Sequence, residues 1–123
     1  MSKTTSARAV IKTAMANIAW PVYYQQADEK AALPYVVYSV DTINNADFVD
    51  RCELEFNVVG YGRDTSPVED MTDTIYNIFD HQTFFTDEVS FTTYFERKNN
   101  VEEPDRKIIR RRMTFFFDLY ERG

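Results

Sequence analysis

"RCELEFNVVGYG", residues 51–62, alternates apolar and polar side chains through most of its length. Successive side chains of a strand point to opposite faces, so this period of two predicts a strand with one buried face and one wet face. The side chains expected on the buried face are Cys52, Leu54, Phe56 and Val58, and those expected on the wet face are Glu53, Glu55 and Asn57. Two glycines close the run, and a sheet built on such a strand needs helices over one face only.

Four further segments have the composition of strands. They are residues 22–27 (VYYQQA), 35–40 (YVVYSV), 88–98 (EVSFTTYFERK) and 107–122 (KIIRRRMTFFFDLYER). The apolar residues that share one face of the last segment are Ile109, Met113, Phe115, Phe117 and Leu119, with Arg111 interrupting them. Residues 41–50 (DTINNADFVD) are predicted to be a mobile loop or an irregular strand end. Residues 99–105 (NNVEEPD) are predicted to be a polar hairpin tip.

Two segments have the spacing of helices. Residues 5–19 repeat apolar side chains at helical intervals, Thr4, Thr5 or Ser6 is the expected cap, and Trp20-Pro21 ends the helix. Residues 66–82 (SPVEDMTDTIYNIFDHQ) begin with Ser66 as the expected N-cap and Glu69 as its capping-box partner. The order of elements predicts an α+β fold, with an antiparallel sheet of four to five strands and two α-helices packed on one face.

Length, net charge and cysteine count limit the classes of protein to which the chain can belong. The length suits a single domain covering residues 1–123, and the formal net charge of −6 argues against a protein that wraps nucleic acid. The one cysteine, Cys52, excludes an intrachain disulfide and is expected to be a buried thiol in a reducing compartment. The sequence has no signal-peptide core and no run of about 18 apolar residues, so cytoplasmic assembly without membrane contact is expected.

No constellation of residues predicts catalysis. His81 is the only histidine, and its expected role is to satisfy carbonyl groups at a helix end. None of the HExxH, CxxC, GxSxG or GxGxxG motifs occurs. Asp70, Asp73 and Asp80 are expected on the solvated face of the second helix rather than at a metal ion. The sequence therefore predicts a protein that is not an enzyme, with no catalytic residue, metal ligand or cofactor.

Three consecutive arginines, residues 110–112, lie in the last strand. Alternation along a strand prevents all three from sharing one face, which weakens a nucleic-acid interpretation. Arg110 and Arg112 are expected to pair across the wet face with Glu53 and Glu55, or with Glu96. Arg111 falls on the apolar face, so it is expected at the rim of the sheet or in a contact with another chain.

The segments also follow a known order. An N-terminal helix precedes WPVYY (residues 20–24) and LPYVVYS (residues 33–39), the latter having the pattern LPY-V-Y. The alternating strand ELEFNVVGYGRD (residues 53–64) leads directly into the helix SPVEDMTDTIYNIF (residues 66–79), and the last strand ends in FFFDLYER (residues 115–122). Over roughly residues 5–120 the chain resembles the tail-completion, or tail-terminator, family of long-tailed (siphophage-type) bacteriophages.

The resemblance implies a structural virion protein at the interface of head and tail. Members form a ring, commonly a hexamer, that caps the head-proximal end of the tail tube and ends tail polymerisation. The implied partners are further copies of the chain, the major tail tube protein and the head-completion or connector protein. DNA passes through the channel only as cargo, and an acidic chain would resist sticking to it.

The surfaces expected to make these contacts come from four parts of the sequence: residues 35–40, residues 41–50, the hairpin tip at residues 99–105, and the last strand. Phe48 and Val49 are apolar residues in a polar loop, which suggests either a contact surface or a loop folded back on the core. Both faces of residues 35–40 carry apolar side chains, so the face without helices must meet the chain's own loops or a neighbouring subunit. The candidate contact residues are Asn44, Asn45, Phe48, Val49, Val101, Glu102, Glu103, Arg111, Tyr35 and Tyr38.

Three alternatives remain open at the level of sequence. The chain could be a head-completion or adaptor protein of the connector, which sequence barely separates from a tail terminator. It could be a small α+β ligand-binding domain, in which Arg111 and His81 would line one buried cavity. A nucleic-acid-binding module is the third, and its binding would fall steeply with salt.

Overall fold

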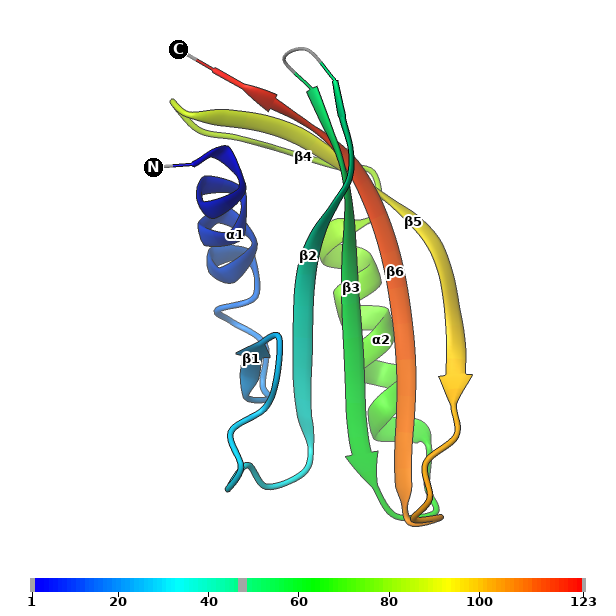
Figure 1. Cartoon of the computed structure of the whole chain (residues 1–123). Coiled ribbons are helices and arrows are strands. Elements are labelled where there is room, and N and C mark those ends of the chain that lie inside the picture. The colour runs from blue at the N-terminus through cyan, green and yellow to red at the C-terminus, as the bar shows by residue number, and fades with distance from the viewer. Residues whose placement is uncertain (1, 47–48, 123) are drawn as a thin grey trace.

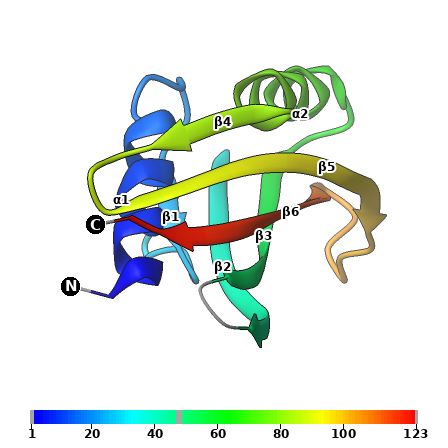
Figure 2. The same ribbon diagram turned by 90° about the horizontal axis from the view of Figure 1, so that it is seen from above.

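A computed structural model describes residues 2–46 and 49–122 of the chain. Within them, two helices and a six-stranded mixed sheet form an α+β fold in which the sheet is strongly curled into a half-barrel (Figure 1 and Figure 2). The elements in chain order are α1 (Lys3–Ala14), β1 (Val22–Tyr24), β2 (Tyr35–Ala46), β3 (Val49–Tyr61), α2 (Ser66–Phe79), β4 (Gln82–Phe85), β5 (Val89–Val101) and β6 (Ile108–Glu121).

The strand order is β1-β2-β3-β6-β5-β4, so β1 and β4 are the edges of the sheet. The sequence-based prediction of four to five antiparallel strands is wrong in two respects. β1 runs parallel to β2, with Val22 opposite Val36, because residues 25–34 carry the chain back before β2 begins. β4 was not predicted: only its first residue, Gln82, falls in the segment assigned to the second helix, and the positive φ of His81 (53°) turns the chain out of that helix.

β2 and β3 are longer than predicted. Their antiparallel ladder extends from Tyr35 opposite Val59 to Ala46 opposite Val49, with one register shift between Thr42 and Asn44. Residues 41–46 are therefore an irregular strand end, which is one of the two predicted conformations, and not a mobile loop, because cross-strand pairing outweighs the low strand propensity of Asp and Asn. The paired segments form an arm at the upper end of the sheet in Figure 1, on which Ile43 is 60% exposed.

One hydrophobic core joins both helices to the concave face of the sheet. Phe56 of β3 is at its centre, with ring centroids 5.1 Å from Phe79 of α2 and 5.7 Å from Phe115 of β6. Each fully buried Phe stabilises the fold by about 1.5–3 kcal/mol relative to an exposed ring. The predicted buried set of β3 is confirmed by the burial of Cys52, Leu54, Phe56 and Val58. In β6 the buried apolar residues are Met113, Phe115, Phe117 and Leu119.

The helix ends differ from the predicted ones. α1 ends at Ala14 rather than at residue 19, and its N-cap is Ser2, whose Oγ accepts a hydrogen bond from the amide of Thr5 at 3.1 Å. The N-cap of α2 is Thr65 rather than Ser66, and the Thr65 side chain makes no capping hydrogen bond. The expected capping box does not form, because Glu69 turns toward cations of the sheet instead.

Gly60 sets how closely β3 and α2 approach. A Cβ at this position would collide with Cγ2 of Val68, which is buried in the first turn of α2. Only a residue without a side chain lets the start of α2 lie this near the sheet.

Candidate functional site

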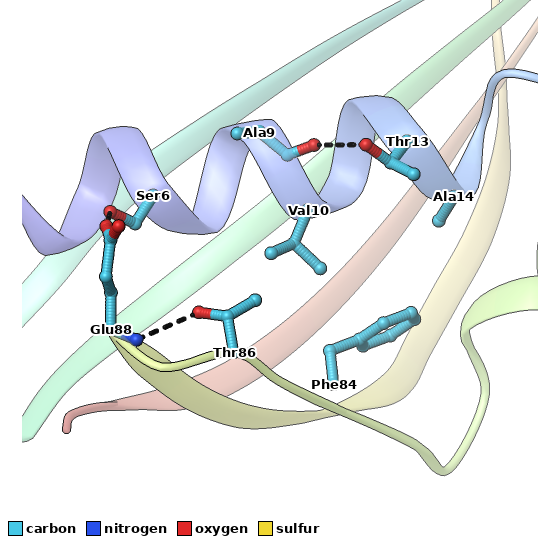
Figure 3. Close-up of a pocket in the computed structure, with 8 residues that line it drawn as sticks. All are labelled: Ser6, Ala9, Val10, Thr13, Ala14, Phe84, Thr86 and Glu88. Atoms are coloured by element: carbon cyan, nitrogen blue, oxygen red, sulfur yellow. Dashed lines mark hydrogen bonds between the residues drawn. The ribbon is translucent and has the colours of Figure 1, made fainter.

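Helix α1 is flanked by two hollows, of which the first lies between α1 and β4 (Figure 3). It is a groove of about 530 Å³. The side chains of Val10, Ala14 and Phe84 point into it from opposite sides. The remaining residues that line it are Ser6, Ala9, Thr13, Thr86 and Glu88.

The polar atoms around this groove are paired with one another. Ser6 Oγ donates to Glu88 Oε2, and Thr86 Oγ1 accepts a hydrogen bond from the Glu88 amide at 3.1 Å. Thr13 Oγ1 donates to the carbonyl of Ala9 at 3.0 Å. Glu88 is thus the one titratable group of the lining, and it is already hydrogen-bonded. The groove suits apolar side chains of a partner better than acid–base chemistry.

The groove adjoins an edge of the sheet. β4 pairs with β5 on one side only, so its other side has backbone groups without a neighbouring strand. Phe85 of β4 is 70% exposed, with the Arg122 guanidinium carbon 5.5 Å from its ring centroid. A free strand edge beside an apolar groove is typical of a surface that contacts another protein chain.

The second hollow, which we call the Arg8 cleft, lies between α1 and β1. It measures about 500 Å³ and is lined by Arg8, Lys12, Met15, Ala16, Ile18, Trp20, Val22, Tyr23, Tyr24 and Tyr38. The Arg8 guanidinium carbon lies 3.8 Å from the ring centroid of Tyr24, whose ring meets that of Tyr38 edge-on at 5.1 Å. Nε of Arg8 is buried and has no hydrogen-bond partner among the described residues. Burial raises the pKa of the Tyr38 hydroxyl, and the Arg8 charge opposes the rise.

The hairpin residues predicted as contacts fall into two groups at opposite ends of the sheet (Figure 1). Asn44 is exposed and Val49 half-buried near the tip of the β2–β3 arm. Asn45 is described by its backbone position opposite Asp50, and Phe48 lies outside the described residues.

The second group lies at the β5–β6 connection, where Val101 and Glu103 are half-buried and Glu102 is exposed. Val49 and Val59 of β3 mark the two ends and are ten residues apart in the ladder. At the rise of a strand this is about 33 Å.

Tyr35 and Tyr38 lie on opposite faces of β2. Tyr38 is in the core and only 5% exposed, which leaves little of its ring for another chain. Tyr35 is half-buried on the convex face and lines a hollow of about 300 Å³. The connection after β1 supplies part of that lining, including Ala31 and Leu33. The chain's own loop therefore covers part of this face, which is one of the two outcomes expected from the sequence.

The three arginines of β6 all have acidic partners within the chain. Arg110 donates to Asn57 Oδ1 at 2.9 Å and to Glu103 at 3.0 Å, so its predicted pairing with Glu53, Glu55 or Glu96 is wrong. Arg112 Nε lies 3.2 Å from Glu55 Oε1, which confirms the predicted cross-strand pair, although its N–H is not aligned for a hydrogen bond.

Arg111 does reach the concave face, where its Nε lies 2.7 Å from Glu69 Oε1 of α2. Lys98 of β5 holds the second oxygen of the same carboxylate at 2.9 Å. The hydrogen bond from Lys98, which has the largest effect, and that from Arg111 lower the pKa of Glu69, whereas burial raises it. Arg111 thus has a partner within its own chain, a contact that periodicity in β6 could not reveal.

His81 belongs to a different cluster. Its Nδ1 lies 2.9 Å from Asp80 Oδ1, and its ring meets Tyr94 edge-on at 5.1 Å. Hydrogen bonds lower the pKa of Asp80. The one from Tyr76 has the largest effect, and those from His81 and the Phe95 amide add to it. His81 follows the last turn of α2, whereas Glu69, which binds Arg111, lies in the first turn. About 15 Å of helix therefore separates His81 from Glu69. Arg111 and His81 therefore do not share a cavity.

Three further features bear on possible chemistry or membrane contact: the Cys52 thiol, the acidic side chains and the character of the helices. Burial raises the pKa of the Cys52 thiol, which makes it a poor nucleophile. Across residues 2–46 and 49–122, no group of three or more His, Cys, Asp or Glu side chains is arranged to hold a metal ion. Neither of the two described helices has the length and apolar character needed to cross a membrane.

Comparison with known proteins adds no relative. No protein-family model matches the chain, and no curated protein matches it either. The resemblance to tail-terminator proteins consequently rests on the order and pattern of the sequence segments, and the role that it implies is a proposal.

Proposed function

We propose that the chain is a structural virion protein that forms a ring on the head-proximal end of a phage tail tube. In this role it ends tail polymerisation and offers a surface to the head-completion protein. One observation carries the proposal beyond the resemblance: the apolar groove between α1 and β4 lies beside a free strand edge, and its one titratable residue, Glu88, is bound to Ser6. That combination favours contact with protein over catalysis.

The requirements of a ring agree with the surfaces of the molecule. A ring repeats one heterologous contact around an axis, so each copy needs two different complementary surfaces. The groove, the Arg8 cleft and the arm that presents Ile43 are different surfaces on one copy. A stable join between copies buries more than about 1,000 Å². The exposed edge and grooves supply area for such a join.

The proposal is tested with purified protein and purified tail tubes. Sedimentation and negative-stain electron microscopy of the mixture should show a ring of uniform size on one end of each tube, and tubes so capped should no longer elongate. Capped tubes should then join heads that carry their completion protein. A chain that stays monomeric and neither caps tubes nor joins heads would falsify the proposal, and a ring found only on the connector would make it a head-completion protein.

A further inference from the structure

The two helices carry opposite charges. α1 contains Lys3, Arg8 and Lys12 and no acidic residue, whereas α2 contains Glu69, Asp70 and Asp73 and no basic residue. In α1, Lys3 forms an ion pair with Asp50. In α2, Glu69 forms ion pairs with Lys98 and Arg111. In the part of the chain that the structure describes, no ion pair is formed by Arg8, Lys12, Asp70 or Asp73.

The basic side is the Arg8 cleft. Arg8 and Lys12 are four residues apart and therefore lie on one side of α1, facing the hollow toward β1. The buried Nε of Arg8 without a partner shows that the cleft still has hydrogen-bonding capacity to offer. Between the groove and the Arg8 cleft the side chains are small: they are those of Ala9, Thr13 and Ala16. A second helix can therefore approach α1 closely.

The acidic side is the outer face of α2. Asp70 and Asp73 are exposed and three residues apart, which places them together on that face. Tyr76 lies beside them in sequence, is 39% exposed and packs edge-on against Phe95 at 5.1 Å. This face thus presents two free carboxylates and one ordered aromatic ring. The Arg8 cleft presents two cations among the rings of Trp20 and Tyr24.

We propose that the Arg8 cleft of one copy binds the outer face of α2 of a second copy. Arg8 and Lys12 pair with Asp70 and Asp73, and Tyr76 contacts the aromatic lining of the cleft. Figure 1 and Figure 2 show α1 and α2 apart from each other, so the two surfaces are different places on one copy. Copies joined in this way run head to tail and close into a ring when the rotation permits. This inference rests on the proposed ring and names the contact that joins its subunits.

The strength expected of this contact follows from its kind. A contact between one helix and one cleft is expected to bury less than the roughly 1,200–2,000 Å² in total that stable interfaces bury. The isolated chain is therefore expected to associate reversibly, and the charged pairs make that association weaken as salt is added.

The test exchanges the charges across the contact. Lys12→Glu in the cleft and Asp73→Lys on α2 should each weaken self-association about tenfold or more in sedimentation velocity, because like charges then meet. An equimolar mixture of the two variants should associate again, since each cleft now finds an α2 of opposite charge. Both changes are at exposed positions, and circular dichroism checks that each variant is folded.

Controls separate this contact from general charge effects. Glu96→Lys and Arg97→Glu place the same charge changes at exposed positions of β5 and should leave association unchanged. Lys12→Gln and Asp73→Asn remove charge without reversing it, and they should show smaller losses. Trp20 is the single tryptophan and lines the cleft, so its emission should change with association in the wild type and not in Lys12→Glu.

Each outcome has one meaning. If both charge-reversed variants associate like the wild type, the subunits join elsewhere and the inference is wrong, while the proposed ring stands. If a short single-stranded oligonucleotide shifts Trp20 emission and wild-type copies do not associate, the cleft is a phosphate site and the inference is wrong. A wild type that neither associates at any concentration nor caps tubes overturns the inference and the proposed function together.

Discussion

Arg111 of β6 and Glu69 of α2 are joined at 2.7 Å, between Nε and Oε1, across the concave face of the sheet. The pair explains why an arginine interrupts the apolar face of β6: it meets the first turn of α2 at the edge of the core. Lys98 of β5 binds the same carboxylate, so one acidic residue ties the helix to two neighbouring strands.

Glu69→Gln is expected to lower the free energy of unfolding at neutral pH by about 0.5–1 kcal/mol, since Glu69 is a third exposed and solvent screens both contacts. The folded-state pKa of Glu69 is lowered, so its stabilisation is complete above the pKa of an unfolded glutamate. It is lost as the pH falls through the lower, folded-state pKa. Urea unfolding across this acidic range should show wild type and variant converging, and Glu96→Gln, at an exposed position, should track the wild type.

Gly60→Ala is expected to destabilise the chain by about 1–3 kcal/mol, because the new methyl group overlaps Val68 in a filled core. Adding Val68→Ala to this variant should restore part of the loss, although Val68→Ala alone is destabilising. Urea midpoints of the four proteins measure the coupling. Strictly additive effects would show that the collision between β3 and α2 does not limit the packing.

A negative charge on β2 should be costly on one face and tolerated on the other. Tyr38→Asp is expected to cost more than about 3 kcal/mol or to unfold the chain, because it removes a buried ring and buries a carboxylate. Tyr35→Asp is expected to cost about 1–2 kcal/mol, since its side chain is half-buried on the convex face. Equal losses in denaturant unfolding would contradict this assignment of faces.

The Cys52 thiol should react with a disulfide reagent only when the chain opens. It is fully buried, and burial raises its pKa, so little thiolate is present at neutral pH. In the folded protein the reaction should be far slower than in urea, and destabilising variants such as Gly60→Ala should speed it. Rapid labelling of the folded wild type would show that β3 is open to solvent at this point.

Local pattern was sufficient for much of the fold. Alternation identified the buried face of β3 through Leu54 and Phe56 and that of β6 through Phe115 and Phe117, because period two fixes which side chains share a face. The helix predicted from the spacing of residues 66–82 forms as α2, with Val68, Met71, Ile75 and Phe79 buried. The same reasoning placed Glu55, the partner of Arg112, among three candidate glutamates.

Pattern was not sufficient where pairing partners decide the conformation. The composition of residues 41–46 left a mobile loop and an irregular strand end both open, and pairing with β3 decides for the strand. β4 has four residues, too few for a period to show, and it exists because β5 pairs with it. The parallel pairing of β1 with β2 depends on the path of the intervening connection, which no local signal encodes.

By itself, the sequence determined which side chains lie together on each strand and helix and that the two helices have opposite charge, since both depend on neighbours along the chain. Only the tertiary structure decided that Arg111 meets Glu69, that Arg8 lies over Tyr24 in a cleft with Trp20, and that the groove beside α1 borders a free strand edge. Those relationships join residues far apart in the chain. Their positions are set by the curl and order of the whole sheet, which many weak contacts determine together.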